Sequence, residues 1–462
     1  FTQGRMRLSI TPSAGLIESA GAAPAALFTT PLPAPQVIET LARYLAKALA
    51  DTPVRHGVLM FAVDFVNPAY QSHPQFEDAV KRYAPFKGDL VVDVIKKTKK
   101  VLEIVAILGG QWPHSSFMVP GGIASVPGGN DIFQCSYLLS IYRKWYEEVI
   151  LGCTLERWRE VRNLSDLDAW LEESYSHRNS HLGFYIKFGR KSGLDKIGKG
   201  IGKFLSYGSL EIPEGSAVTT ARGGRYLIPA GFADGVQVAN FDQSHIAEHV
   251  AYSFYQDYEG GRHPFDGITK PQPAAGETGK YSWSKAPRYD GAPAETGPLA
   301  ELIIAGHPLV SDVVSKEGPS AFVREFARLV RPAELMPAME IWLSEIKEGT
   351  SFYKSPGEIK DGEGIGLTHA SRGALGHWVR VKNNKIDHYQ IITPTAWNGS
   401  PRDSDGRRGP WEEALIGTPV KDTANPVELG HVIRSYDACL VCTVHTVSRG
   451  TKIGSTTFGV SS

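Results

Sequence analysis

No charge of either sign dominates this sequence, because 49 Lys and Arg residues are balanced by 49 Asp and Glu residues. This balance excludes the broad electrostatic field that draws proteins to nucleic acid or anionic membranes, so binding must come from specific sites. Apolar runs are short, and none approaches the roughly 20 residues that a transmembrane helix needs. The first residues, FTQGRMRLSI, lack the apolar core of a secretory signal. We therefore expect a chain without signal peptide or transmembrane segment, located in the cytoplasm or joined to a membrane only through a partner.

Cysteine is scarce, with four residues in 462. So few thiols exclude a disulfide framework, and they cannot support an iron–sulfur cluster in addition to another metal site. Cys135 and Cys153 fall in or beside a predicted long helix and are interpreted as core thiols. The other two cysteines lie close together near the C-terminus, within RSYDACLVCTVH (434–445).

Helical patterns dominate the first half of the chain, whereas the middle contains shorter runs divided by Gly and Pro. Short runs between Gly183 and Val238 predict strands and loops. The segment Asp257–Asp290 is predicted to be loop. Apolar residues at intervals of three or four predict helices over Val37–Leu49, Phe76–Leu108, Phe133–Gly152 and Pro298–Glu348.

One hairpin is predicted with a specific turn, in VRVKNNKIDHYQIITPTAW (379–397). Two alternating strands flank Asn383 and Asn384, and asparagine tolerates the left-handed geometry of a tight turn. The sequence shows neither an internal repeat nor a clean linker. The predicted fold is therefore mainly α (α+β), a single domain over residues 1–462 with a central bundle of long helices and small peripheral β-sheets.

Cys439, Cys442 and His445 give the strongest local signal of a functional site. Two thiolates at i and i+3 on a turn chelate one metal ion, and the histidine adds a third ligand or a supporting group. The same spacing occurs in redox dithiols and zinc sites, and two buried structural thiols would also produce it. The residues alone leave these alternatives open.

Two other motifs have both a chemical and a structural interpretation. HIAEH (245–249) has the spacing of a zinc motif, but no third ligand is evident, and the following AYSFY predicts a stripe that packs a helix against the core. Arg372, in ASRGALGHW (370–378), either aims its donors at an anionic or cyanide-like ligand or pairs with a carboxylate such as Glu412 or Asp403.

Taken together and in order, several segments resemble the large subunit of nickel–iron hydrogenases. The variants PHSSFMVPGG and CLVCTVH look most like the high-affinity, oxygen-tolerant uptake branch of that family. The matching segments run collinearly and are DFVNPAY (64–70), GGQWPHSSFMVPGG (109–122), AYSFY…HPFDGITKP (251–271), SRGALGHWVRVKNNKIDHYQIITPTAWNGSPRD (371–403), GPWEEALIGTPV (409–420) and RSYDACLVCTVH (434–445).

The resemblance implies specific metal ligands at the C-terminal motif. Cys439 would be a terminal nickel ligand, and Cys442 would bridge nickel to an iron that carries cyanide and carbon monoxide. His445 would bind a nearby magnesium ion. Soft thiolates suit nickel across its redox states, and a terminal thiolate accepts the proton when dihydrogen splits heterolytically.

The same resemblance implies roles for residues around the centre and a partner protein. Arg372 would lie over the open coordination position, while Pro401 and Asp403 would shape the iron side. Large subunits of this family pair with an iron–sulfur small subunit. We therefore expect a heteromeric assembly with no affinity for nucleic acid.

The sequence also departs from the family pattern. The family binds its metals with four thiolates, and the second cysteine pair should fall before the helix near Val37, yet no cysteine precedes Cys135. In the N-terminal strand, Gln3 stands where a metal-binding glutamate is expected and Arg5 where a histidine is. Near the C-terminal motif, Ala438 and Ser371 replace prolines. These changes indicate a degenerate active site.

The ends of the chain fit the same interpretation. Residues 1–36 are expected to form a shortened N-terminal strand and a connector. Residues 446–462 resemble the extension that a dedicated protease removes after nickel insertion, and here that extension is retained.

Three functions follow as hypotheses. The first is a hydrogenase-like subunit that pairs with an iron–sulfur small subunit in a redox complex without an intact nickel–iron centre. The second is an active hydrogen-oxidising subunit. The third is a structural zinc site at Cys439, Cys442 and His445. No cofactor is certain, and whether the chain is an enzyme stays open.

Overall fold

The computed structural model describes residues 54–111, 118–119, 122–123, 127–212, 215–220, 224–273, 279–346, 353 and 360–438, and the backbone of 442–448 and 451–458. Several sequence predictions fall outside these residues: the N-terminal strand and connector, the helix over Val37–Leu49, and Cys439.

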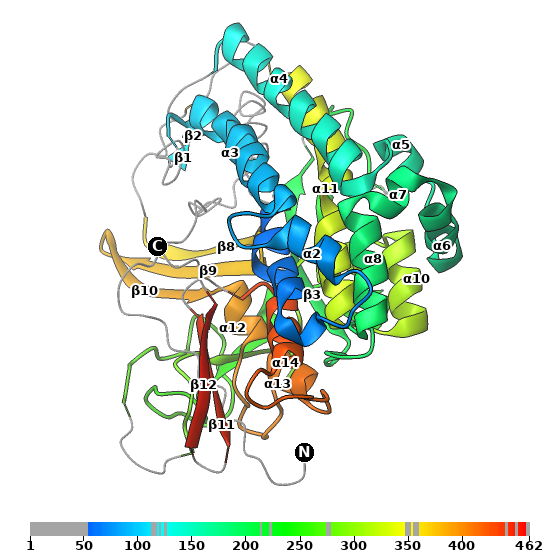
Figure 1. Cartoon of the computed structure of the whole chain (residues 1–462). Helices are drawn as coiled ribbons and strands as arrows, with labels where there is room; N and C mark the ends of the chain where they lie inside the picture. Colours follow the sequence, from blue (N-terminus) through cyan, green and yellow to red (C-terminus); the bar gives the residue numbers. More distant parts are fainter. Residues whose placement is uncertain are drawn as a thin grey trace.

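Long helices form the bulk of the molecule (Figure 1). The longest, α11 (Ala321–Glu345), begins where the Ser320 hydroxyl accepts the Val323 N–H at 3.2 Å. Its residues are buried on almost every side, which is typical of a helix at the centre of a bundle. It contacts α4 (Gly129–Trp145), which continues as the π-helix η5 (Tyr146–Leu151), and α8 (His181–Ser192). The predicted central bundle is confirmed.

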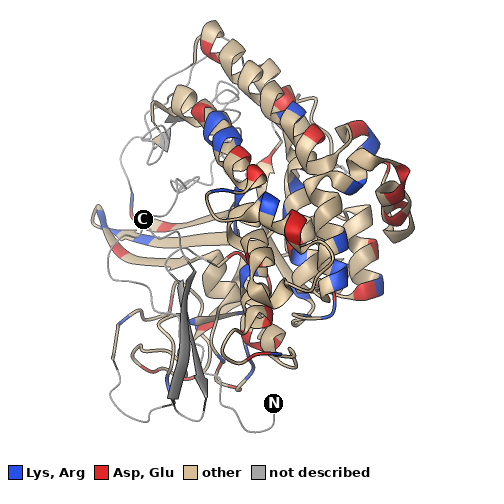
Figure 2. Ribbon diagram, in the orientation of Figure 1, with Lys and Arg blue, Asp and Glu red and all other residues tan. Residues whose placement is uncertain are grey.

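Other helices surround this bundle, with acidic and basic side chains interspersed over them (Figure 2). Segment DFVNPAY lies in the 3₁₀ turns η3 (Ala62–Val66) and η4 (Pro68–Tyr70) and follows the π-helix η2 (Gly57–Phe61). The remaining helices are α2 (Phe76–Tyr83), α3 (Asp89–Gly109), α5 (Leu155–Trp158), α6 (Leu164–Glu173), α7 (Tyr175–Asn179), α9 (Pro298–Ile304), α10 (Pro308–Glu317), α12 (Pro394–Asn398), α13 (Pro410–Leu415) and α14 (Val427–Ser435).

Two helix predictions need correction. The segment 76–108 is two helices, α2 and α3, because Pro85 interrupts the pattern and Phe86 adopts a positive φ of 57°. The segment beginning at Gly183 is helix α8 and not a strand. Gly183 lies so close to the His177 carbonyl that a Cβ would be 1.9 Å from it, so this glycine permits close packing instead of ending a helix.

Small antiparallel sheets lie beside the helices. The first has the order β3-β4-β5 (Lys203–Glu211, Tyr226–Asp234, Gln237–Ala239). The second has the order β10-β9-β8, with β8 over Gly362–Ala370, β9 over Gly373–Lys382 and β10 over Lys385–Ile392. Its turn confirms the predicted hairpin, since Asn383 and Asn384 have φ values of 51° and 57°. The two-stranded sheets pair β1 (Met118–Val119) with β2 (Gly122–Ile123), β6 (Ile246–His249) with β7 (Ala286–Tyr289), and β11 (Cys442–Ser448) with β12 (Thr451–Phe458).

Two hydrophobic clusters hold these elements together. The larger joins the helices, and the smaller lies among the sheets and contains Trp378 and Trp397, both fully buried. Cys135 is buried in the larger cluster and Cys153 packs against it, so both predicted core thiols are confirmed. No helix of the described residues has the length and apolar character needed to span a membrane.

Candidate functional site

Asp437 anchors the chain immediately before the C-terminal cysteine motif. It follows α14 with a left-handed φ of 53°, and its backbone N–H donates to Arg434 O at 2.8 Å. Its carboxylate is buried, with Oδ2 at 2.8 Å from His56 Nδ1. Arg372 Nε donates to Asp437 O at 3.0 Å and lies 3.5 Å from Oδ1. Residues from three distant parts of the sequence therefore meet two residues before Cys439.

Arginines set the electrostatics of this anchor. Burial alone would raise the pKa of Asp437, but Arg372, His56 and Arg328 outweigh burial and hold that pKa well below its usual range. Arg328 Nη1 also pairs with Glu325 Oε2 at 2.5 Å. Burial raises the pKa of Glu325 to about 7 even though Arg328 opposes the shift. The environment of Asp437 is thus buried and electropositive.

The turn between β8 and β9 positions Arg372. Gly373 has a φ of 121°, and a Cβ there would lie 2.4 Å from Thr296 Oγ1 and 2.5 Å from Gly297 N. Thr296 Oγ1 accepts the Ala374 N–H at 2.7 Å. The Asn398 side-chain amide accepts the Thr296 N–H and donates to the Thr296 carbonyl. The predicted pairing of Arg372 with a carboxylate is correct in kind, but the partner is Asp437 and not Glu412 or Asp403.

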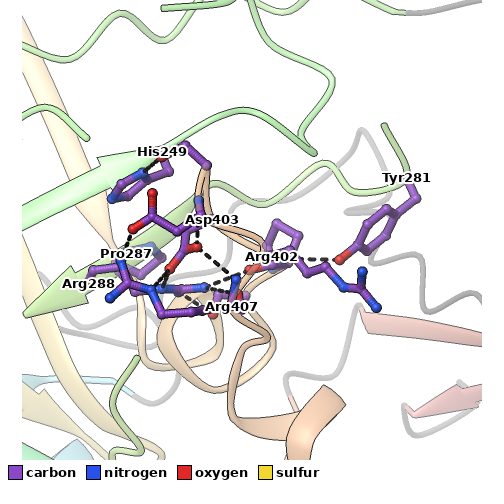
Figure 3. Close-up of polar contacts among 11 residues, drawn as sticks. His249, Tyr281, Pro287, Arg288, Arg402, Asp403 and Arg407 are labelled. Atoms are coloured by element: carbon purple, nitrogen blue, oxygen red, sulfur yellow. Dashed lines mark hydrogen bonds and ion pairs between the residues drawn. The ribbon is translucent and has the colours of Figure 1, made fainter. Parts of the chain in front are cut away.

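Asp403 belongs to a second cluster, organised by Arg288 (Figure 3), and the Pro401 carbonyl joins the same cluster. Arg288 lies on β7 with a fully buried guanidinium, and its Nε donates to Asp403 Oδ2 at 2.7 Å. Its Nη2 donates to Pro401 O at 3.0 Å, and Arg407 Nε reaches Asp403 Oδ2 at 3.1 Å. Arg288 and Arg407 lower the pKa of Asp403 against the effect of burial. The loop 400–407 is therefore held by charge-assisted hydrogen bonds.

Ile246–His249 of HIAEH form strand β6, and His245 ends the 3₁₀ turn η6 (Gln243–His245), so the expected helical role of the motif is wrong. His245 Nδ1 pairs with Asp290 Oδ1 at 2.9 Å, and His249 Nδ1 bonds Ser404 Oγ at 2.8 Å. The two rings thus have separate partners. No group of three or more His, Cys, Asp or Glu side chains is arranged to hold a metal ion in the part of the chain that the structure describes.

HIAEH contains a buried glutamate, Glu248, a feature that the sequence analysis missed. Glu248 Oε2 accepts Gln390 Nε2 at 2.7 Å and lies 3.7 Å from Lys285 Nζ. Burial raises the pKa of Glu248 to about 7, although Lys285 and Gln390 oppose this shift. Lys285 Nζ also donates to Thr269 Oγ1 at 2.7 Å. The short segment KAPRY (285–289) contains the cation of two buried pairs, since Lys285 lies near Glu248 and Arg288 pairs with Asp403. These two cations in one short segment were the sequence signal that could have indicated buried ion pairs.

Cys442 and His445 lie on β11, where they pair with Phe458 and Ser455 of β12. The turn predicted around them is therefore replaced by a strand from Cys442 onward. Cys439 lies outside the described residues. Asp437 and Ala438 are the described residues immediately before this motif, and Arg372 is hydrogen-bonded to Asp437.

The remaining cysteines are held elsewhere in the fold. Cys135 lies in α4, where burial raises the pKa of its thiol to about 12. Cys153 Sγ accepts Trp170 Nε1 at 3.4 Å, just before α5. In Figure 1 both helices lie well apart from α14, which leads into the C-terminal motif. Both of these thiols therefore belong to the helical part of the molecule.

Comparison with known proteins gives consistent matches. A family model described as nickel-dependent hydrogenase matches residues 65–445. The periplasmic [NiFeSe] hydrogenase large subunit of Desulfomicrobium baculatum is 32% identical over 435 residues, covering 85% of this chain and 75% of that protein. The uptake hydrogenase large subunit of Azotobacter chroococcum mcd 1 is 30% identical, covering 83% and 67%. A solved Ni-Fe-Se hydrogenase from D. vulgaris Hildenborough superposes with a TM-score of 0.70 at 28% identity, covering 87% of this chain and 81% of that one.

Proposed function

Because the chain belongs to the nickel-dependent hydrogenase large-subunit family, we propose that it forms a redox complex with an iron–sulfur small subunit and does not assemble the standard nickel–iron centre. In such a complex it serves as scaffold, electron-transfer partner or host of altered chemistry. The same proposal includes its location, which is the cytoplasm or a membrane that it reaches through a partner.

The positions of the thiols carry this proposal. Only Cys439 and Cys442 follow the Asp437 anchor, while Cys135 and Cys153 are packed in the helical part of the molecule. Two thiolates supply half of the four that the family centre uses. Nickel held by half its sulfur ligands would lose the soft coordination that stabilises its redox states.

Support for a partner comes from the relatives and from the surface. The relatives are named large subunits, which implies a smaller subunit beside them. On α4, Phe133 and Tyr137 are 75% and 59% exposed and lie four residues apart, on one face of the helix. Exposed aromatic side chains of this size are typical of surfaces that a partner covers.

Co-purification tests the partner and a metal assay tests the centre. The full chain, tagged and co-expressed with a hydrogenase-type small subunit, should retain that subunit through size exclusion. The complex should contain iron–sulfur absorption from the partner and no stoichiometric nickel. A chain that elutes alone as a monomer would contradict the partner proposal, whereas stoichiometric nickel would contradict the loss of the centre.

A second candidate, an active hydrogen-oxidising subunit, is favoured by the preserved surroundings of the motif. Arg372 is fixed over the segment that leads to Cys439, and Asp403 and Pro401 are fixed around Arg288. Hydrogen-dependent dye reduction by the complex, abolished by Arg372→Met and accompanied by about one nickel per chain, would establish this function.

A further inference from the structure

The turn that follows β7 is an exposed Asp-Gly pair, Asp290 and Gly291. Tyr289 and Ala292 exchange both backbone hydrogen bonds across it, at 2.9 and 2.8 Å. Asp290 has a φ of 47° and Gly291 a φ of 69°, which makes this two-residue hairpin turn type I′. The Asp290 side chain is 62% exposed. A carboxyl group in contact with water therefore lies directly beside the backbone amide of a glycine.

Such a pair can react internally without a cofactor. The Gly291 nitrogen bonds to Cγ of Asp290 and closes a succinimide ring, while the amide proton and the carboxyl hydroxyl leave as water. Hydrolysis of the ring adds one water at either carbonyl carbon. It yields aspartate again or isoaspartate, in which the main chain runs through the side-chain carbonyl. Neither step is a redox step, so no oxidant or reductant is needed.

The backbone of this turn is close to the geometry that ring closure needs. Bringing the Gly291 nitrogen to Cγ requires the peptide plane between the two residues to rotate, which converts a type I′ turn into a type II′ turn. Both types keep φ positive at the first central residue and both close a two-residue hairpin, so the hydrogen bonds of Tyr289 with Ala292 can stay. Gly291 tolerates the rotation because glycine adopts φ of either sign. None of the backbone hydrogen bonds among the described residues uses the Gly291 N–H, so the rotation breaks none of them.

His245 lies at the carboxyl group that must lose an oxygen. Its Nδ1 is 2.9 Å from Asp290 Oδ1, and its side chain is 48% exposed. The Asp290 N–H donates to His245 O at 3.1 Å, so the backbone holds the two residues together. A protonated imidazole in this position supplies the proton with which an ionised carboxylate oxygen leaves as water.

The chain contains four other Asp-Gly pairs, and the structure restrains the glycine of each. In three of them the glycine N–H already donates to a backbone carbonyl: Gly235 to Gly202 at 2.8 Å, Gly267 to His263 at 2.9 Å and Gly406 to Asp403 at 2.9 Å. The fourth, Gly362, is paired with Val381 in the ladder of β8 and β9. These pairs share the chemistry of Asp290 and Gly291 but not the backbone freedom of Gly291, so they are controls within the same molecule.

We propose that Asp290 is a modification site, at which the protein converts itself to a succinimide and then to isoaspartate. The product adds one methylene group to the main chain directly after β7. Arg288 lies two residues earlier, and a Cβ at Gly291 would lie 3.6 Å from Arg407 Nη2. Both arginines bind Asp403, so the modification loosens the charge-assisted contacts that hold the loop 400–407. This inference goes beyond the proposed function and does not depend on whether a metal centre assembles.

The experiment ages the full chain near neutral pH in water enriched in ¹⁸O. Peptide mapping by mass spectrometry locates each heavy oxygen that ring hydrolysis inserts, and enzymatic methylation of isoaspartate with S-adenosylmethionine measures how much isoaspartate forms. The same incubation in denaturant gives the rate of each Asp-Gly pair without folded structure. Asp266, which precedes Gly267, and Asp405, which precedes Gly406, are the matched sites.

We expect the folded chain to form isoaspartate at Asp290 at least about tenfold faster than at Asp266 and Asp405, because the amides at those sites must first give up a hydrogen bond. In denaturant the three rates should be similar, since the dipeptide is the same. A rate at Asp290 in the folded chain no higher than at Asp266 and Asp405 overturns the inference.

Two further measurements test its parts. His245→Gln should slow the reaction at Asp290 and leave that at Asp266 unchanged, and an equal rate in this variant would overturn the role of His245. The aged fraction, separated by ion exchange, should unfold at a lower denaturant concentration than the unaged fraction. Equal midpoints would overturn the effect on the loop 400–407.

Discussion

Arg288 and Asp403 form an ion pair of 2.7 Å in which neither side chain is exposed to solvent. Arg288 fills its other donors with Ser400 Oγ and with the carbonyl oxygens of Pro287, Pro401 and Arg407, so the guanidinium links β7 to the loop 400–407. A buried charge is stable only when it is paired and hydrogen-bonded. The pair therefore holds the loop that contributes Pro401 and Asp403 to the candidate site.

Breaking this pair should destabilise the protein strongly. Arg288→Met leaves the Asp403 carboxylate without its buried partner, and we expect a loss of about 3–5 kcal/mol in the free energy of unfolding. Chemical denaturation monitored by tryptophan fluorescence measures it. Arg380→Met is the control, because Arg380 pairs with Glu363 at the surface and such pairs contribute about 0–1 kcal/mol. Equal losses in both variants would contradict the role given to Arg288.

Gly373→Ala should displace the turn that positions Arg372. A Cβ at this residue would lie 2.4 Å from Thr296 Oγ1 and 2.5 Å from Gly297 N, well inside normal contact, and the φ of 121° disfavours any side chain. We expect a loss of stability of about 2 kcal/mol or more, since backbone strain and overpacking add. Gly362→Ala, at the start of β8, is the control because a Cβ there meets no atom within 4 Å. If the Gly373→Ala protein is as stable as the Gly362→Ala protein, the turn accommodates a Cβ without a loss of stability, which would contradict this prediction.

His431 should be replaceable by leucine with a gain in stability. This histidine is fully buried on α14 among Phe61, Phe65 and Tyr70, and neither ring nitrogen has a hydrogen-bond partner among the residues that the structure describes. An unsatisfied buried polar group costs about 1–3 kcal/mol. His431→Leu removes two such atoms at similar volume, so the midpoint of denaturation should rise. His431→Ala should lower that midpoint, because it leaves a cavity. A lower midpoint for leucine would show that the ring nitrogens have partners in solution.

The contribution of Glu248 to stability should fall as the pH rises from about 4.5 to 7, because burial raises the pKa of Glu248 to about 7 from the ordinary 4.5. The folded state then binds the proton more tightly than the unfolded state. The contribution is complete below the unfolded pKa and is lost as the pH passes through the folded pKa. A tenfold difference in proton affinity between the two states corresponds to about 1.4 kcal/mol of stability.

Glu248→Gln should make the slope of the unfolding free energy against pH more positive within that window, because it removes the contribution that falls with pH. Glu103→Gln provides the comparison, because Glu103 is exposed on α3 and pairs with Lys100 at the surface. If the slope between pH 4.5 and 7 is the same with glutamine at position 248 as with glutamate, then Glu248 does not bind its proton more tightly in the folded state.

The long helices and the hairpin could be predicted from sequence because local patterns determine them. Apolar spacing located α4 and α11, and Asn383 and Asn384 located the turn between β9 and β10. The segment at Gly183 could not, because Gly183 packs against the His177 carbonyl and Gly189 against the distant Phe322, and a single sequence does not reveal these contacts.

The candidate site was predictable only in part. Arg372, Pro401 and Asp403 were identified from their motifs, but their partners Asp437 and Arg288 come from elements far away in the sequence. His56 carried no local signal, because it lies 381 residues from Asp437. Contacts at such separations depend on the packing of the whole helical bundle.

Nickel content tests the central claim most directly. The chain, co-expressed with a hydrogenase-type small subunit in a host competent for nickel insertion, is purified as the complex and assayed by mass spectrometry for nickel per chain. Iron is less informative, because the clusters of the partner contain it. We predict nickel far below one atom per chain. Nickel at about one atom per chain, with hydrogen-dependent dye reduction, would contradict the account.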